Sequence, residues 1–134
     1  MTRYLSGIAS DLINRRGLVP ARVKAARLQS DRVGLGTPVL GELIAGIQNS
    51  NDPPRHLAAM WRNIAQLALW SFDKAAAIEF GRLYAGLRRA GRTLQVPDLQ
   101  IAAIALSLGN CTVLAKDNDL RAVPGLKVED WSQP

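Results

Sequence analysis

The sequence is poor in the residues that form most metal sites and many catalytic sites. It contains one histidine, His56, and one cysteine, Cys111, among its 134 residues. A single histidine excludes catalysis by paired histidines and any multi-histidine metal site within one chain. A single cysteine excludes disulfide scaffolds and cysteine-rich zinc modules. We expect His56 to be exposed at the start of a helix, and Cys111 to be a small core residue.

Aromatic residues and long apolar segments are also scarce. The aromatic content of 5% argues against an RNA surface built from stacked bases, and we expect Trp61, Trp70 and Trp131 to serve packing. No apolar run approaches the ~20 residues of a membrane span, and no hydrophobic signal segment follows the N-terminus. We therefore expect no membrane association and a cytoplasmic location.

Helical and strand patterns alternate along the chain, which predicts a three-layer α/β/α sandwich around a mainly parallel sheet, in one domain over residues 1–134. Apolar spacing, caps and closing glycines predict helices over 8–13, 21–29, 38–48, 55–66, 73–90 and 99–108. Short apolar runs predict strands over 31–36, 67–72, 111–115 and 126–128, and we expect the strand over 67–72 to be buried. The predicted inner face of the helix over 73–90 consists of Ala77, Phe80, Leu83, Tyr84 and Leu87.

Four acidic residues fall where an open parallel sheet binds ligands, beyond the carboxyl ends of its strands. Glu42 lies one turn into the helix over 38–48, and Asp98 begins the helix over 99–108. Asp117 and Asp119 directly follow the strand over 111–115. Apolar neighbours surround Glu42 in the sequence, an environment that disfavours an unpaired charge.

These acids have simpler interpretations as well. Asp98 is suited to capping its helix, and Asp117 or Asp119 taken alone is suited to a polar turn. Taken together, carboxylates without cysteine or histidine ligands favour a hard cation such as Mg²⁺ or Mn²⁺. On a protein with 17 basic against 11 acidic residues and a net charge of +6, such a site favours phosphodiester hydrolysis.

The densest basic run consists of Arg88, Arg89 and Arg92, at the end of the predicted helix over 73–90. One interpretation is that these charges stabilise the carboxyl end of that helix. The other is that they line an RNA groove, since they lie shortly before Asp98 in the sequence. The two interpretations remain open at the level of sequence.

The order and spacing of four segments resemble PIN-domain ribonucleases of the VapC toxin type. The segments are Gly41-Glu42-Leu43, Pro97-Asp98-Leu99 with Ile101-Ala102-Ala103, Leu114 to Leu120, and Val123-Pro124-Gly125-Leu126 followed by Val128 to Trp131. No single tripeptide is specific, but the ordered set covers nearly the whole chain.

This resemblance implies a PIN-like fold and an Mg²⁺- or Mn²⁺-dependent endoribonuclease. Such proteins are the toxins of type II toxin–antitoxin pairs, usually dimeric and kept silent by a cognate antitoxin. Residue by residue, Glu42, Asp98 and Asp117 match the catalytic, metal-binding acids, and Asp119 matches the additional metal-site acid found two residues further on.

The sequence departs from the family pattern near its N-terminus. There the family has a first strand that runs into Asp-Thr-Asn, whereas this chain has Ser6 and Gly7 after Tyr4-Leu5 and is about two residues shorter. Asp11 is no obvious substitute, because it lies about one turn into the following helix. Loss of one carboxylate lowers the charge of a magnesium site. We therefore expect either a weakened nuclease or a silent PIN-like protein that acts through antitoxin or RNA binding.

Overall fold

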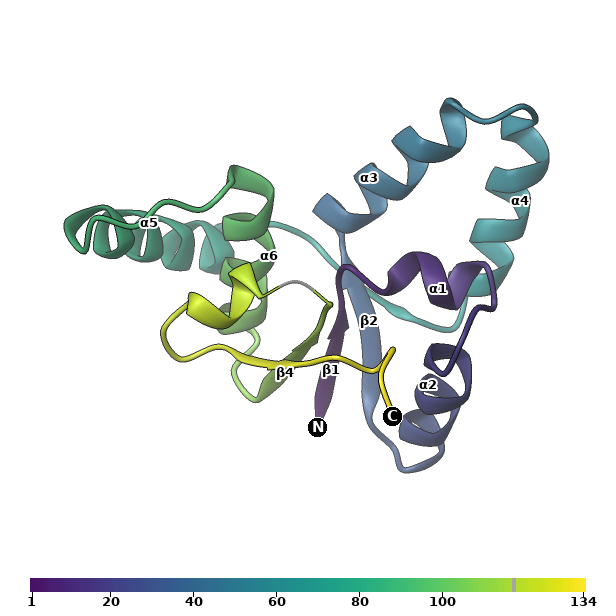
Figure 1. Cartoon of the computed structure of the whole chain (residues 1–134), viewed down its shortest axis with the longest axis horizontal. Coiled ribbons are helices and arrows are strands. Elements are labelled where there is room, and N and C mark those ends of the chain that lie inside the picture. Colours follow the sequence, from purple (N-terminus) through teal and green to yellow (C-terminus); the bar gives the residue numbers. More distant parts are fainter. Residues whose placement is uncertain (117) are drawn as a thin grey trace.

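The computed structural model describes residues 1–116 and 118–134 as strands that alternate with helices (Figure 1). The strands are β1 (Thr2–Leu5), β2 (Arg32–Gly36), β3 (Ala68–Trp70), β4 (Cys111–Leu114) and β5 (Lys127–Glu129). The helices are α1 (Ala9–Ile13), α2 (Val19–Leu28), α3 (Thr37–Gln48), α4 (Pro53–Ile64), α5 (Lys74–Arg89) and α6 (Val96–Ser107), with a short 3₁₀ turn, η1 (Asp119–Ala122). The turn η1 was not predicted from the sequence.

All five strands are parallel, in the order β3-β2-β1-β4-β5. The first strand is central: Leu5 pairs with Leu35 of β2 on one side and with Leu114 of β4 on the other. The order of strands therefore reverses between β1 and β4. In open parallel sheets, ligands bind beyond the carboxyl ends of the strands at such a reversal.

Helices cover both sides of the sheet, which confirms the predicted α/β/α arrangement. Figure 1 shows α5 and α6 on one side and α1, α2 and α4 on the other. The central strands are buried because both of their faces are covered, and every residue of β4 is inaccessible to solvent or nearly so. Cys111, the first residue of β4, is a core residue as predicted, and burial raises the pKa of its thiol to about 11.

The strand over 67–72 was predicted to be buried, and this prediction was wrong. Only residues 68–70 form β3, and the Leu69 side chain is 49% exposed. The strand lies at one edge of the sheet, where β2 is its sole strand neighbour in the described ranges. A short apolar run does not distinguish an edge strand from a central one, because that difference depends on which strands pair.

The longest helix, α5, begins at an N-cap aspartate, whose side chain accepts a hydrogen bond of 2.9 Å from the Ala76 amide. Its buried stripe consists of Ala76, Leu83 and Leu87, narrower than predicted. The predicted inner positions of Ala77 and Tyr84 are wrong: Ala77 is exposed and Tyr84 is 45% exposed. The helix packs mainly against α6, so only one side of it is covered.

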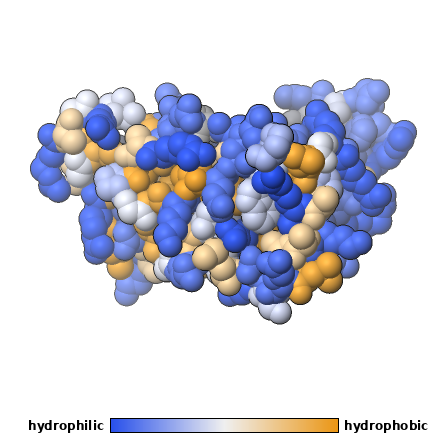
Figure 2. All heavy atoms as spheres, turned by 60° about the horizontal axis from the view of Figure 1, so that its bottom comes forward, coloured by the Kyte–Doolittle hydropathy of each residue, from blue (hydrophilic) through white to orange (hydrophobic). Residues whose placement is uncertain are grey.

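The surface is predominantly hydrophilic on the face that Figure 2 presents, with apolar side chains in smaller patches between the polar ones. Exposed large apolar residues include Trp61, at 47%, although the sequence predicted a packing role for it. Trp131 is buried as predicted. None of the helices in the described ranges combines the length and hydropathy needed to cross a membrane.

Candidate functional site

The carboxyl edge of the sheet brings together three separate parts of the sequence. Ser6 directly follows β1, the helix α3 directly follows β2, and Lys116 comes two residues after β4. The helix α6 leads into β4 from the opposite direction, so that its N-terminus also lies towards this edge. The helices α3 and α6 also contact each other.

Ser6 occupies the end of the central strand and is 8% exposed. Its amide donates a hydrogen bond of 3.0 Å to the carbonyl of Leu114, and its carbonyl accepts one of 2.9 Å from the amide of Ala9. These bonds continue the pairing of β1 with β4 and open α1. The position at which the family pattern has its aspartate therefore holds a neutral side chain on a backbone fixed at both ends.

The acidic residues predicted for the site lie on different elements. Glu42 is on the second turn of α3 and is exposed, so the argument that it is a buried charge in need of a partner was wrong. Asp98 is half-buried in the first turn of α6, and Asp119 is the first residue of η1 and exposed. Asp117 lies outside the described residues.

Asp98 lies in the first turn of α6 but is not its N-cap residue. The N-cap of α6 is Gln95, and Asp98 is the third residue of the helix. A carboxylate in the first turn is still stabilised by the unpaired backbone N–H groups and by the helix dipole. Asp98 and Asp119 each have an interaction partner in the structure.

The donor chemistry of these residues fits a hard divalent cation, since all of them offer carboxylate oxygens. Within residues 1–116 and 118–134, however, no three histidine, cysteine or acidic side chains come together. The described acids alone therefore do not form a complete ligand set. Whether they do so with Asp117 stays a prediction.

Asp11 has a defined partner that the sequence did not suggest. Its carboxylate is 2.8 Å from Nζ of Lys116 and 3.9 Å from Nε of Arg16, and its side chain is 14% exposed. The pair with Lys116 ties α1 to the segment after β4. Asp11 is the acid nearest in the sequence to the position of the missing aspartate, and the pair with Lys116 neutralises its charge.

A buried tyrosine lies beside Glu42. The Tyr4 side chain is fully buried, its ring stacks on Trp70 with centroids 5.7 Å apart, and its hydroxyl has no hydrogen-bond partner within the described residues. Burial raises the pKa of Tyr4 far above its ordinary value, and the charges of Cys111 and Glu42 act in the same direction. The hydroxyl thus remains a proton donor at neutral pH, in the electrostatic field of the Glu42 carboxylate.

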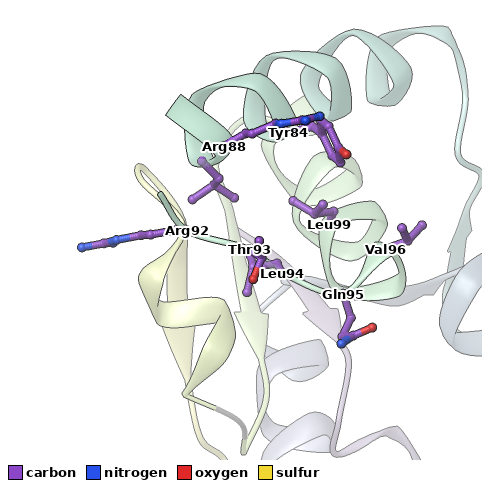
Figure 3. Close-up of a pocket in the computed structure, with 9 residues that line it drawn as sticks. Tyr84, Arg88, Arg92, Thr93, Leu94, Gln95, Val96 and Leu99 are labelled. Atoms are coloured by element: carbon purple, nitrogen blue, oxygen red, sulfur yellow. The ribbon is translucent and has the colours of Figure 1, made fainter. Parts of the chain in front are cut away.

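The predicted RNA-binding arginines are divided between two neighbouring hollows, and Arg92 lines both. Arg88 and Arg92 line a pocket of about 490 Å³ between α5, the connector after it and α6 (Figure 3). Figure 3 shows Arg88 extending along α5 towards the Tyr84 ring, whereas Arg92 points away from the pocket. Arg89 lines a neighbouring hollow with Glu79 and Arg82. The sequence alone did not separate these three directions.

A second hollow, of about 370 Å³, adjoins the acid edge. It lies between α1, α3 and α4, and both Glu42 and His56 line it among mostly apolar side chains such as Leu43 and Ile47. His56 was predicted to be exposed at the start of a helix; this exposure was wrong, because the residue is half-buried against this hollow, and the sequence did not link it to Glu42. Sequence reasoning missed this proximity because 14 positions and a loop separate the two residues.

Comparison with known proteins gives a consistent result for almost the whole chain. A family model for the PIN domain matches residues 7–126. The "tRNA(fMet)-specific endonuclease VapC" of Shigella flexneri is 33% identical over 114 residues, which cover 84% of this chain and 86% of that protein.

Solved structures show the same fold. The VapBC structure from Salmonella typhimurium, described as DNA-bound, is similar with a TM-score of 0.84 and 27% identity, over 98% of this chain and 99% of that one. VapBC2 from Rickettsia felis, described as bound to a DNA fragment from its promoter, is similar with a TM-score of 0.87 and 21% identity, over 98% and 99% of the two chains.

Proposed function

Because this chain belongs to the PIN-domain family, we propose that it is an endoribonuclease and the toxin of a type II toxin–antitoxin pair. Relatives named as VapC endonucleases and ribonucleases support the activity, and solved VapBC complexes support a cognate antitoxin as partner. The proposed substrate is RNA in the cytoplasm. The proposed working form is a homodimer of single-domain chains.

One observation carries the proposal. Two helices that bear acidic residues, α3 and α6, contact each other in a sheet whose strand order reverses between β1 and β4. We propose that Glu42, Asp98 and Asp117 are the catalytic acids and that they, with Asp119, hold Mg²⁺ or Mn²⁺. Such a cation, when bound, supplies a water of lowered pKa and neutralises charge on the phosphate.

The residues of the chain have separate tasks in this proposal. The first turn of α6 stabilises the negative charge of Asp98 through its free N–H groups. The exposure of Glu42 leaves its carboxylate accessible to a substrate or cation from solution. Basic side chains near α6, Arg88 foremost, hold the RNA backbone, which carries one negative charge per nucleotide.

A second candidate function is a silent PIN-like protein that acts through antitoxin or RNA binding. Ser6 favours it, because a buried neutral hydroxyl stands at the end of β1 where the family has a carboxylate. The ion pair between Lys116 and Asp11 also favours the silent protein, because it engages the acid that could otherwise replace the missing carboxylate. The two candidates differ in one measurable property, the affinity for the cation.

The test compares the wild-type chain with a variant that carries Asp-Thr-Asn in place of Ser6-Gly7. Calorimetric titration with Mn²⁺ and cleavage of a labelled single-stranded RNA are measured for both. We expect the restored carboxylate to raise cation affinity by about tenfold or more, because affinity follows the charge of the ligand set. Cleavage by the wild type should be detectable and slower.

The negative control is Asp98→Asn, which should abolish cleavage. Its matched variant is Asp52→Asn, which changes a carboxylate before α4 that forms no ion pair in the described ranges and should leave cleavage unchanged. RNA cleavage by neither the wild type nor the restored variant would contradict the nuclease proposal. Cleavage by the restored variant alone would favour the silent protein.

A further inference from the structure

The pocket between α5 and α6 differs from the other hollows in the side chains at its mouth. Its floor is apolar, formed by Leu87, Leu94 and Leu99. One rim carries the half-exposed ring of Tyr84 with the Arg88 guanidinium beside it, and Gln95 lines the opposite rim with its side-chain amide directed away from the Tyr84 ring (Figure 3). An aromatic ring and a cation thus border an apolar floor in a space of about 490 Å³.

We propose that this pocket binds one unpaired nucleobase of the RNA substrate, with Tyr84 as the stacking platform. The proposal rests on the ribonuclease function proposed above and deepens it, because it assigns a position that selects single-stranded RNA next to the site of cleavage. Tyr84 and Arg88 are then positioning residues rather than catalytic ones.

The chemistry of the rim fits a nucleotide. The Tyr84 ring already stacks on Phe80, with centroids 6.2 Å apart, which holds the ring in place for a base on its exposed side. Every nucleobase has a flat aromatic face, so stacking on such a ring does not depend on which base is bound. Arg88 forms no ion pair in the described part of the chain, so its charge is available to a phosphate.

Charge favours RNA over a peptide as the occupant. None of the lining residues that the structure describes is acidic, and the Arg88 guanidinium lies at the rim. The pocket is also close to the proposed site, since Val96 and Leu99, which line it, lie within two residues of Asp98 on α6.

The first experiment measures the dissociation constant of a fluorescein-labelled single-stranded RNA by anisotropy, in EDTA so that the RNA stays intact. Tyr84→Ala should weaken binding about tenfold, as expected for the loss of one stacked base. Tyr84→Phe, which keeps the ring, should bind like the wild type. The matched control is Trp61→Ala on α4, since Trp61 and Tyr84 are 47% and 45% exposed, and it should change affinity less than twofold.

The second experiment separates stacking from charge by the dependence of binding on salt. Arg88→Ala should reduce the slope of log affinity against log salt by about 0.7, the value for one phosphate contact on a single strand. Tyr84→Ala should lower affinity with the slope unchanged, and Arg62→Ala, an exposed arginine on α4, should change neither. Val96→Glu places a negative charge on a side chain that is 51% exposed at the mouth and should weaken binding without disturbing the core.

Three results would overturn the proposal. One is equal RNA affinity of the wild type, Tyr84→Ala and Val96→Glu, and another is an equal loss of affinity in Trp61→Ala. The third is a change of oligomeric state in Tyr84→Ala, measured by light scattering, with RNA affinity unchanged, which would assign the pocket to a second copy of the chain. Binding that depends on Tyr84 but without cleavage in Mn²⁺ would support the pocket and contradict the nuclease proposal alone.

Discussion

At the scale of single residues, one tightly packed position is the place where the Tyr4 ring crosses β2 to reach Trp70. The ring passes Gly36, and a Cβ atom on that glycine would overlap the Tyr4 hydroxyl and lie 2.9 Å from Tyr4 Cζ and 3.2 Å from Ile104 Cδ1. Glycine is therefore required here for space. Because Gly36 has no side chain, the Tyr4 hydroxyl can lie against the residue that precedes α3, where the charge of Glu42 acts on it.

We expect Gly36→Ala to lower the free energy of unfolding by about 1–3 kcal/mol, the usual cost of overpacking a core. Urea denaturation measures this change. Adding Tyr4→Phe to Gly36→Ala should recover part of the loss, because it removes the overlapping oxygen. Tyr4→Phe alone should not destabilise, since the hydroxyl has no partner within the described residues.

The control for this prediction is Gly81→Ala on α5, where nothing lies within 4 Å of the added methyl group. Alanine has the higher helix propensity, so this variant should be stabilised by up to about 1 kcal/mol. Equal stability of the Gly36 and Gly81 variants would show that the contact with Tyr4 does not constrain the sheet.

At the scale of elements, α5 depends on its N-cap because it is covered mainly along one side, by α6. The helix presents Tyr84 and Arg88 to the pocket, and its first turn is closed by the bond from the Ala76 amide to Asp73. A helix with a narrow buried stripe gains less from packing, so local interactions at its ends carry more of its stability.

We expect Asp73→Ala to destabilise the protein by about 1 kcal/mol, the typical cost of losing an N-cap side chain. The change is measured by urea denaturation, and amide exchange should locate it in the first turn of α5. Asp52→Ala is the matched variant, because Asp52 is the N-cap of α4 but forms no capping hydrogen bond. A cost as large for Asp52 as for Asp73 would contradict the capping explanation.

At the scale of the whole molecule, Asp31 joins the start of the chain to the beginning of β2. Its carboxylate lies 3.4 Å from the N-terminal amine and 3.2 Å from Nε of Arg3, and Arg3 also reaches Glu129 of β5 at 2.7 Å. Desolvation opposes the charged form of Asp31, but hydrogen bonds from Arg3 and the N-terminal amine outweigh it and lower the pKa of Asp31. This network links the amino ends of β1 and β2 to Glu129, the last residue of β5.

A lowered pKa in the folded state makes this contribution to stability dependent on pH. It is fully present above the ordinary pKa of an aspartate, about 3.9, and is lost as the pH falls through the lower folded value. Asp31→Asn should therefore lower the melting temperature at pH 7, and its difference from the wild type should shrink below about pH 4. A difference that stays constant down to pH 2 would exclude this linkage.

The matched control is Glu79→Gln on α5. Glu79 pairs with the exposed Arg82 three residues later, at 3.2 Å. Exposed pairs within one helix contribute little, so this variant should melt close to the wild type at every pH.

The element order, the α/β class and the parallel sheet could be predicted, because they follow from local periodicity, caps and turn residues. The positions of Glu42 and Asp98 near the starts of their helices could be predicted for the same reason. The burial of individual side chains could not be predicted in this way. Leu69, Tyr84 and Glu42 are more exposed than expected, and these three errors share one cause. Periodicity shows which residues of an element are apolar, but only the packing of other elements decides which side of it is covered.

The sequence by itself determined the inventory of chemistry: carboxylates without histidine or cysteine ligands, an excess of basic residues, and Ser6 where the family has an acid. These are properties of residue identity and order, which folding leaves unchanged. Only the tertiary structure decided that Lys116 neutralises Asp11, that Arg88 and Arg89 face different hollows, and that Tyr84 stands open at a pocket next to Asp98. Such relations depend on distances between elements far apart in the chain, and these distances exist only after the sheet has assembled.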